Sequence, residues 1–275
     1  MSQSATLRTL EILEFLSSQS DGTPLSEVAS ALAIPKSVAH RLLGQLVGYG
    51  YVQQDIQGGR YGLTLKLTLL GLRHLAGTGV NDIAQPILDK LAAMSGELAR
   101  LAIVEGRRMH WVAKAQGARY GLRYDPEAGH DVVLHATAVG KAWLSTLPDR
   151  VAVSIFEETR IHMPGRGPNA IMTVAELRKA LAETRDRGYG LAIEEGEPGM
   201  SAIAAVVRSS SHPDAPVVGT LSLAGPSARF DAIRRQVLAL ELVAAARELS
   251  AVWPTRRAPD PAVPELEEGS FAHAR

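Results

Sequence analysis

The segment IPKSVAHRLLGQL, residues 34–46, limits the possible folds of this chain more than any other stretch. Its apolar residues recur at helical spacing and would form one buried stripe: Val38, Leu42, Leu43 and Leu46. The other side of its first two turns carries polar and basic residues: Lys36, Ser37, His40 and Arg41. No acidic residue lies between Pro35 and Val47. The segment therefore predicts a helix that packs with one side and meets a negatively charged partner with the other.

The elements around this segment predict a winged helix-turn-helix. Helices are expected over residues 6–17, 24–32 and 35–47, and hairpin strands over residues 51–54 and 60–63. In the second helix, Thr23 is expected to be the N-cap and Pro24 the first helical residue. Three helices followed by a hairpin form a winged helix-turn-helix, whose third helix enters the major groove of DNA.

This arrangement predicts double-stranded DNA as a partner. A helix of this length is about 20 Å long and fits the major groove, which is about 12 Å wide. The dipole at its N-terminus favours phosphate beside Lys36, Ser37, His40 and Arg41. In the hairpin, Gly59 and Arg60 suit a contact with the DNA backbone or minor groove, and Tyr61 is expected along the sugar-phosphate chain.

The charge of residues 1–76 indicates an oligomer. Six basic and five acidic side chains leave a surplus of only one positive charge. Few phosphate contacts give modest affinity, and a dimer would double them and read two half-sites. One alternative stays open, in which the winged helix contacts a protein and Lys36 and Arg41 are solvated helix ends.

The rest of the chain predicts a mixed α/β domain over residues 78–253 and a proline-rich, disordered tail over residues 254–275. The GTG sequence at 77–79 marks the boundary with the first domain, residues 1–77. Asn81 is expected to cap a helix, and Thr173 with Glu176 forms a capping-box signature. Strands are expected over residues 101–105, 109–115, 120–124, 189–195, 202–207 and 217–223, and helices over 137–147 and 231–252.

Composition excludes several classes of protein and site. The chain has 29 basic and 29 acidic residues, so its overall charge favours neither nucleic acid nor membrane. The absence of cysteine excludes disulfides, thiolate nucleophiles and cysteine-ligated zinc. The N-terminal apolar stretch contains Glu11 and Glu14, unlike a signal peptide, and no run reaches the ~18 apolar residues of a membrane span. We therefore expect a cytoplasmic protein without contact to a membrane.

No motif in the sequence predicts catalysis, a cofactor or a metal. Glu194 and Glu195 could be paired carboxylates, but no positioned histidine accompanies them, so they are interpreted as a strand end with one facing solvent. His130 and His135 are not at a metal-binding spacing, and the GxSxG motif of hydrolases is absent. The remaining alternative is an enzyme or metabolite-binding protein that uses the helix-turn-helix for assembly.

Four stretches in the same order carry a resemblance to a known family: LSEVASALAIPKSVAHRLLGQLVGYGYV, GGRYGLTLKLTLLG, LHATAVGKAWLS and TRDRGYGLAIEEGEPGMSAIAA. Over residues 5–250 the chain resembles the IclR family of bacterial transcriptional regulators. The resemblance implies an α+β fold, with an N-terminal winged helix-turn-helix, a linker helix and a C-terminal mixed α/β effector-binding domain related to the GAF fold. It also implies a homodimer or homotetramer whose affinity for operator DNA is set by a small organic acid.

The resemblance also implies an effector site. It places backbone amides of Ala138, Val139 and Gly140 at a helix N-terminus, where they can hold a carboxylate. Further lining falls on Ala192, Met200, Ala202, Ser222 and Ala224. Three of these, Ala192, Ala202 and Ala224, replace polar residues of the family's pattern for small keto-acids. We therefore expect a less polar effector than glyoxylate or pyruvate, such as an aromatic or branched carboxylic acid. The alternative is that the strands are misaligned by one residue.

Overall fold

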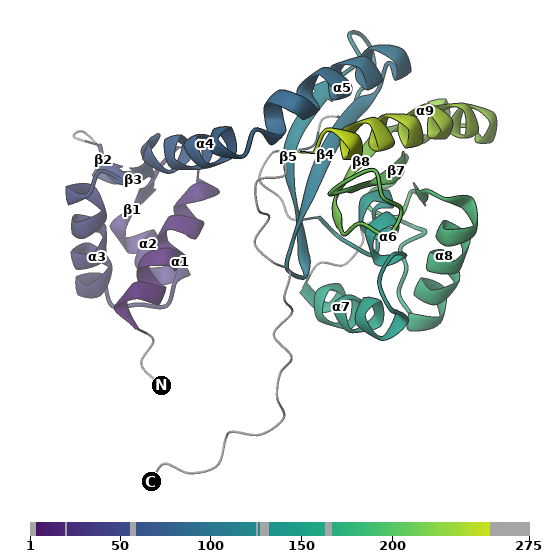
Figure 1. Cartoon of the computed structure of the whole chain (residues 1–275). Helices are drawn as coiled ribbons and strands as arrows, with labels where there is room; N and C mark the ends of the chain where they lie inside the picture. Colours follow the sequence, from purple (N-terminus) through teal and green to yellow (C-terminus); the bar gives the residue numbers. More distant parts are fainter. Residues whose placement is uncertain are drawn as a thin grey trace. The chain divides into compact units, whose positions relative to one another are not determined.

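The computed structural model describes residues 4–19, 21–55, 59–124, 126, 132–162 and 167–253 (Figure 1). The expected tail at residues 254–275 and His130 lie outside the described residues. The chain divides into two compact units, residues 1–77 and 78–275, and each is described by itself.

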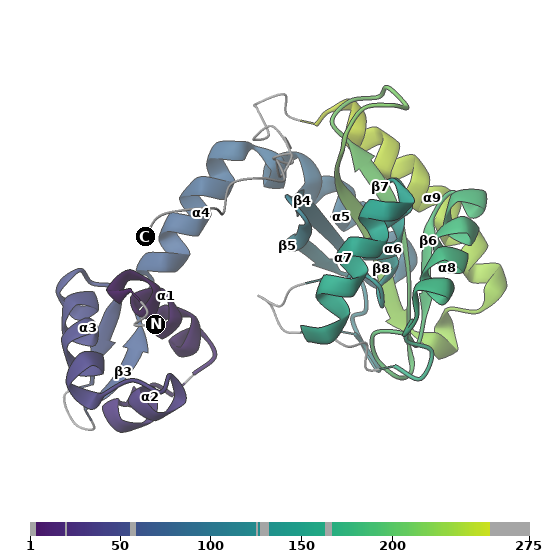
Figure 2. The same ribbon diagram turned by 90° about the horizontal axis from the view of Figure 1, so that it is seen from below.

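The first unit is a small helical bundle with a three-stranded antiparallel sheet (Figure 2). Its helices are α1 (Ala5–Ser17), α2 (Leu25–Ala31), α3 (Lys36–Gly48) and α4 (Lys66–Thr78). Its strands are β1 (Thr23–Pro24), β2 (Val52–Gln54) and β3 (Arg60–Leu63), in the order β1-β3-β2. This is the predicted winged helix-turn-helix, with α2 and α3 as its two central helices.

Thr23 corrects the sequence interpretation. It is not the N-cap of α2: it pairs with Tyr61 in the sheet, its residue is only 1% exposed, and the helix begins at Leu25 after Pro24. Pro24 has extended backbone angles, which carry the chain straight from β1 into the helix. A third strand stabilises a hairpin that would be marginal alone, so tertiary pairing outweighs the local capping preference.

The core of the first unit lies between α1, α2, α3 and the sheet. Leu42, Leu43 and Leu46 are buried as predicted, but Ala39 and not Val38 completes the stripe, since Val38 is half-buried. Positions 39, 42, 43 and 46 follow the i, i+3, i+4, i+7 spacing of one helix face. On α1 the buried residues are Ile12 and Leu16.

The second unit is built around a five-stranded antiparallel sheet in the order β5-β4-β8-β7-β6. Its strands are β4 (Leu98–Glu105), β5 (Arg108–Gln116), β6 (Gly190–Ile193), β7 (Met200–Arg208) and β8 (Val217–Pro226). Helices α5 (Val80–Ser95) and α9 (Ala232–Ala251) pack on one face, and α6 (Ala138–Leu144) packs on the other, beside α7 (Asp149–His162) and α8 (Val174–Arg187). A short 3-10 helix, Ser227–Arg229, follows β8.

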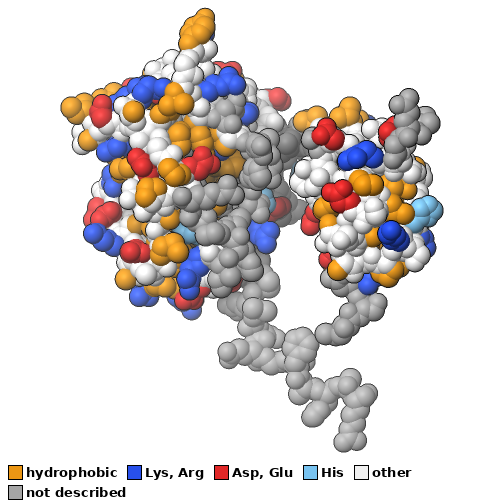
Figure 3. Space-filling model, turned by 180° about the vertical axis from the view of Figure 1, so that it is seen from behind, with side chains coloured by type: hydrophobic (Ala, Val, Ile, Leu, Met, Phe, Trp, Pro, Cys, Tyr) orange, Lys and Arg blue, Asp and Glu red, His pale blue; other side chains and the backbone are white. Residues whose placement is uncertain are grey.

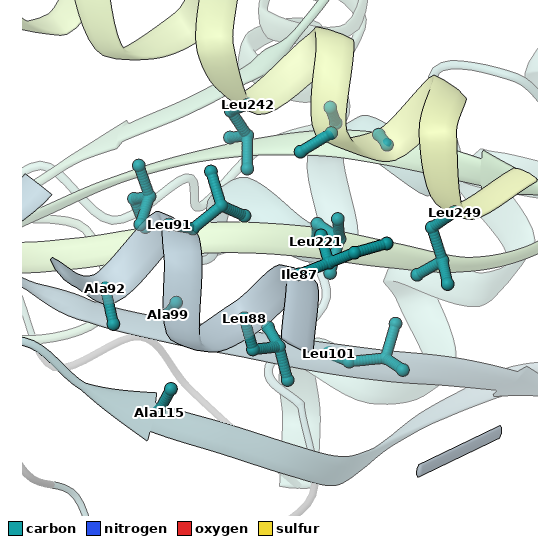
Figure 4. Close-up of a cluster of buried hydrophobic side chains, with 14 of the residues drawn as sticks. Ile87, Leu88, Leu91, Ala92, Ala99, Leu101, Ala115, Leu221, Leu242 and Leu249 are labelled. Carbon is teal, nitrogen blue, oxygen red and sulfur yellow. The ribbon is translucent and has the colours of Figure 1, made fainter. Parts of the chain in front are cut away.

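Strand alternation separates two cores in this unit. Leu101 and Leu221 point towards α5 and α9, where they pack with Leu88 and Leu242 (Figure 4). The residues between them along the strands point towards α6, α7 and α8 and are mostly small, such as Ala102. One face of the sheet is therefore a leucine-rich core, and the other carries several alanines, among them Ala102, Ala192 and Ala204.

Two sequence interpretations of the second unit are corrected, and one helix was missed. Gly79, with a left-handed φ of 70°, and not Asn81, precedes α5 as its N-cap. Residues 120–124 form no strand, because the chain turns at Gly121, whose φ is 74°. Helix α7 was not predicted at all. The capping box of Thr173 and Glu176 is confirmed at the start of α8.

Candidate functional site

The first candidate surface is the exposed front of α3. Pro35 is its N-cap residue, and its carbonyl oxygen accepts hydrogen bonds from the amides of Val38 and Ala39, each at 3.0 Å. The four side chains predicted to contact DNA are all exposed: Lys36, Ser37, His40 and Arg41. Within the part of the chain that the structure describes, no hydrogen bond or ion pair engages them. The front of α3 is therefore positively charged and free to bind.

The same face continues further along α3 than the sequence analysis foresaw. Gly44 and Gln45 are exposed one turn beyond His40 and Arg41. A Cβ atom on Gly44 would meet nothing within 4 Å. Figure 3 shows Lys, Arg and His side chains at the surface of this smaller unit. The helical spacing from Ser37 to Gly44 could have identified this extension.

Two wing residues predicted to contact DNA, Gly59 and Arg60, already make hydrogen bonds within the first unit. Arg60 is exposed, but its guanidinium donates from Nε and Nη2 to the carbonyl oxygen of Gly22, at 3.1 and 2.9 Å. Gly59 is half-buried, with a left-handed φ of 63°, and its carbonyl oxygen accepts from the side chain of Gln54. Residues 56–58, the tip of the hairpin, lie outside the described residues.

Tyr61 corrects the prediction made for the wing. Its residue is 4% exposed and belongs to the core with Val28 and Leu42. The expectation that its ring lies along the sugar-phosphate chain is therefore wrong. On a strand of four residues, alternation does not reveal which side is covered, and here the pairing with Thr23 places Tyr61 in the middle strand of the sheet.

The second candidate surface is the small-residue face of the large sheet. Ala192 pairs with Ala202, and Ala202 pairs with Ala224, so the three alanines form one row across β6, β7 and β8. Ser222 lies in the next row on the same face, opposite Ala204. Met200 is half-buried at the edge, opposite Pro226. The strands therefore bring the proposed lining residues onto a single face.

The start of α6 lies against this face with little free backbone. The amide of Gly140 donates to Thr137 Oγ1 at 3.1 Å, so it is already engaged, whereas those of Ala138 and Val139 remain as candidate donors to a ligand. The side chains of Ala138 and Val139 are buried in the core. A Cβ atom at Gly190 would lie 2.1 Å from the carbonyl oxygen of Ala138. The helix start is therefore held closely against β6.

Arg100 is the residue of this face that the sequence analysis missed. It lies on β4 between Ser222 on β8 and Lys114 on β5. Its guanidinium carbon is 3.6 Å from the ring centroid of Trp111 and 5.6 Å from that of Tyr124. Burial lowers the pKa of Arg100, while Tyr124, by charge and hydrogen bond, and Glu197 act to raise it. Burial also raises the pKa of Tyr124.

Polar groups beside Arg100 have few partners. Nε of Arg100 and Oγ1 of Thr220 are buried and have no hydrogen-bond partner among the described residues. The hydroxyl of Ser222 donates to the carbonyl oxygen of Arg100 only at the long distance of 3.5 Å. Most buried polar groups in proteins have a partner, so unpaired ones mark a place for water or a ligand.

Two further buried groups near α6 have structural roles. Lys141 Nζ donates to both carboxylate oxygens of Glu195, at 2.5 and 2.7 Å, which ties α6 to the chain just after β6. Glu195, whose side chain is only 12% exposed, is therefore the member of the pair that does not face solvent. His135 packs edge-on against Phe156, and burial, with a smaller contribution from Arg160, lowers its pKa to about 4.

Among the described residues, no group of three or more histidine, aspartate or glutamate side chains could hold a metal ion. No helix described by the structure is long and apolar enough to cross a membrane.

Comparison with known proteins identifies both units. A family model described as the IclR helix-turn-helix domain matches residues 5–55, and one described as the C-terminal domain of the bacterial transcriptional regulator IclR matches residues 72–251. The HTH-type transcriptional regulator XynR of Escherichia coli K12 is 28% identical over 227 residues, which cover 82% of this chain and 86% of XynR. The acetate operon repressor of Salmonella typhimurium LT2 is 27% identical over 248 residues, covering 90% of this chain and 88% of the repressor.

Solved structures show the same fold. The IclR transcriptional regulator of Alicyclobacillus acidocaldarius superposes with a TM-score of 0.76 at 24% identity, over 91% of this chain and 98% of that one. The IclR protein of Thermotoga maritima gives a TM-score of 0.70 at 24% identity, over 89% and 96% of the two chains.

Proposed function

Because this chain belongs to the IclR family of bacterial transcriptional regulators, we propose that it binds operator DNA through α3 and changes its affinity when a small carboxylic acid binds the second unit. The resemblance noted in the sequence and the predicted fold class are confirmed. Relatives in the family are regulators of transcription and not enzymes, which confirms the expectation that this chain is not an enzyme. A role on chromosomal DNA implies the cytoplasm.

One observation carries the DNA-binding part of the proposal: the exposed, acid-free front of α3 above a buried leucine stripe. Lys36 and Arg41 supply charge, and Ser37 and His40 supply hydrogen-bonding groups for base edges and phosphates. Arg60 supports this role from the wing, where Gly59 and Arg60 lie beside the hairpin tip. The partner is double-stranded operator DNA.

The linker helix supports a homo-oligomer. Leu65, just before α4, and the helix residues Leu69, Leu70 and Leu72 are between 43% and 73% exposed. An isolated helix of this length is marginal in water, because most helical stability comes from packing an apolar face. A second copy of the chain would bury these leucines and add a second DNA-reading helix. We therefore propose a homodimer through α4, or a homotetramer that contains it, and the mass measured by light scattering distinguishes the two.

The alanine row supports an effector of low polarity. Ala192, Ala202 and Ala224 offer methyl groups where a small keto-acid would need donors and acceptors, and Ser222 alone adds a hydroxyl. A structural neighbour from Microbacterium hydrocarbonoxydans, 23% identical with a TM-score of 0.71, is described as a complex with 4-hydroxybenzoate. At that identity it supplies a probe for this chain and no evidence about its ligand. We propose an aromatic or branched monocarboxylic acid.

The test measures binding of the full-length protein to the DNA upstream of its own gene. We expect the Lys36→Ala/Arg41→Ala double variant to bind that fragment at least about tenfold more weakly than the wild type, because two cationic contacts are lost. Arg247→Ala, which removes an exposed charge from α9, is the control and should change binding less than about twofold.

The same assay is repeated with benzoate, 4-hydroxybenzoate, isovalerate and glyoxylate. A change in DNA affinity with one of the first three supports the proposal, and a response to glyoxylate alone contradicts the low-polarity effector. Equal binding by the double variant and the wild type would favour the alternative in which the winged helix contacts a protein.

A further inference from the structure

We propose that Arg100 binds the carboxylate of the effector and that the body of the effector lies over the alanine row beside it. The inference rests on the proposed effector-binding role and specifies it: one side chain recognises the charge, and the ligand is a monocarboxylate with a flat or branched apolar body.

The environment of Arg100 differs from that of other arginines in the same unit. Arg229 donates from Nε and Nη2 to the two carboxylate oxygens of Glu97, at 2.7 and 2.8 Å. Arg107 pairs with Glu158, and Arg178 pairs with Asp149. Of the ion pairs between described residues, none includes Arg100. A charged guanidinium taken out of water without an anion is costly, so the missing partner points to an anion from outside the chain.

The contacts that Arg100 does make leave an edge of the guanidinium for that anion. Trp111 lies against its flat face at 3.6 Å, a cation–π contact that orients the group without neutralising it. Tyr124 hydrogen-bonds to it, and Glu197, which is exposed and hydrogen-bonds to the same tyrosine, acts on Arg100 through its charge without a hydrogen bond of its own. Nε has no partner. An arginine fork held flat in this way suits the two oxygens of a carboxylate.

Two hydroxyl groups lie on the same face of the sheet as Arg100, Ser222 directly beside it and Thr220 on the side away from the alanine row. Ser222 is opposite Arg100 on β8, and Thr220 is two residues further along the same strand face. Both hydroxyls can donate, and Thr220 Oγ1 is buried without a partner. Donors converge here while no carboxylate pairs with Arg100, so the site suits an anion and not a cation.

The sheet geometry sets the size of the ligand. Strands lie about 4.8 Å apart, so Ala224 on β8 and Ala202 on β7 lie about 5 and 10 Å across the sheet from β4. That span matches a carboxyl group carrying one ring or a short branched chain. A second carboxylate on the ligand would meet the methyl groups of this row without a partner, so dicarboxylates should bind poorly.

The experiment compares benzoate with benzamide, a neutral molecule of nearly the same shape, by calorimetry on the full-length protein. The wild type should bind benzoate at least about tenfold more tightly than benzamide, because charge-assisted hydrogen bonds are stronger than neutral ones. Arg100→Gln should lose about tenfold in benzoate affinity and bring the benzoate-to-benzamide ratio close to one. Arg100→Lys keeps the charge without the fork and should give an intermediate ratio.

Lys114→Gln is the matched control, because Lys114 is the strand neighbour of Arg100 and is exposed. It should change benzoate affinity by less than about twofold. Circular dichroism and thermal unfolding establish that each variant is folded, and Arg100→Lys provides a second reading if Arg100→Gln is unstable.

The outcomes separate the two proposals. If folded Arg100→Gln or Arg100→Lys keeps the wild-type preference for benzoate over benzamide, the role of Arg100 is overturned while the acid-responsive function stands. If the wild type binds none of benzoate, isovalerate and glyoxylate, the acid-effector function itself fails, and the role of Arg100 fails with it.

Discussion

The front of α3 and the surroundings of Arg100 both present cations without a paired carboxylate, but in opposite environments. Lys36 and Arg41 are in water, where each charge is well solvated and gains little from a single contact. Arg100 is half-buried and packed against Trp111, where solvent screens its charge less. Exposed cations therefore suit a long, repeating anion that is contacted many times, and a half-buried cation suits one small anion that is bound at a single place.

The largest expected difference between the two regions is their response to salt. Raising salt from about 50 to about 200 mM should weaken DNA binding by about a thousandfold if a dimer makes about six phosphate contacts, because bound counterions are released. Benzoate binding should weaken less than about threefold, because a buried pair is poorly screened. Anisotropy and calorimetry at matched salt measure both, and equal salt slopes would contradict the distinction.

A second test uses one histidine from each unit, the buried His135 of the second and the exposed His40 of the first. The pKa of His135, about 4, lies below the ordinary value of 6.5, so the unfolded chain takes up this proton first as the pH falls. Stability is therefore unaffected above about pH 6.5, declines below it and levels off near pH 4, by about 3 kcal/mol in total. His135→Leu should remove this decline in urea unfolding.

His40→Leu, on the exposed front of α3, is the control for that experiment. If His135→Leu unfolds with the same dependence on pH as the wild type, the decline originates elsewhere. That result would contradict the prediction that protonation of the buried His135 destabilises the fold below about pH 6.5.

A third test asks whether each cation serves only its own region. Arg41→Ala should weaken operator binding by about 1–3 kcal/mol if the side chain reaches a guanine, and the loss should be specific to one base position. A uniform loss on every sequence would assign Arg41 to phosphate instead. Arg100→Gln should leave operator binding without acid within about twofold of the wild type, and a larger loss would show that the two regions are coupled before any ligand binds.

The smallest expected effect concerns two buried threonines whose hydroxyls have no hydrogen-bond partner among the described residues, Thr23 in the first unit and Thr220 in the second. Replacing either by valine removes an unsatisfied hydroxyl and should raise the free energy of unfolding by up to about 1 kcal/mol. Thr220→Val should also weaken benzoate binding by a few-fold, whereas Thr23→Val should leave it unchanged. Equal benzoate affinities in both variants would remove Thr220 from the ligand site.

Strong local signals allowed much of the fold to be predicted from sequence. Helix α3 has a regular apolar stripe, and α8 has a capping box, so both were anticipated. Helix α7 was not, although its apolar residues have a helical period and Asp149 lies in its first turn, because Pro148 and not a capping side chain precedes it. The strand β1 has two residues, too few for any period, so its pairing with β3 could not be read locally.

The candidate sites were predictable to different degrees for the same reason. The prediction that Ala192, Ala202 and Ala224 line a site depended on the resemblance to a family. The strand register places these three alanines side by side. Arg100 was missed because the expected strand began at Leu101, whereas β4 begins at Leu98 and includes Arg100. Arg100 lies against Trp111 on the next strand because a bulge after Leu101 shifts the register between β4 and β5. Sequence spacing does not show that shift.

Two glycines near α6 have a mechanical consequence. A Cβ atom at Gly140 would lie 2.0 Å from the carbonyl oxygen of Leu134, and one at Gly190 would lie 2.1 Å from that of Ala138. Main chain touches main chain at both points, with no compressible side chain between them to absorb a displacement. A ligand that pushes on α6 must therefore move the Leu134 segment and β6 as one stiff assembly, which transmits sub-ångström shifts without loss.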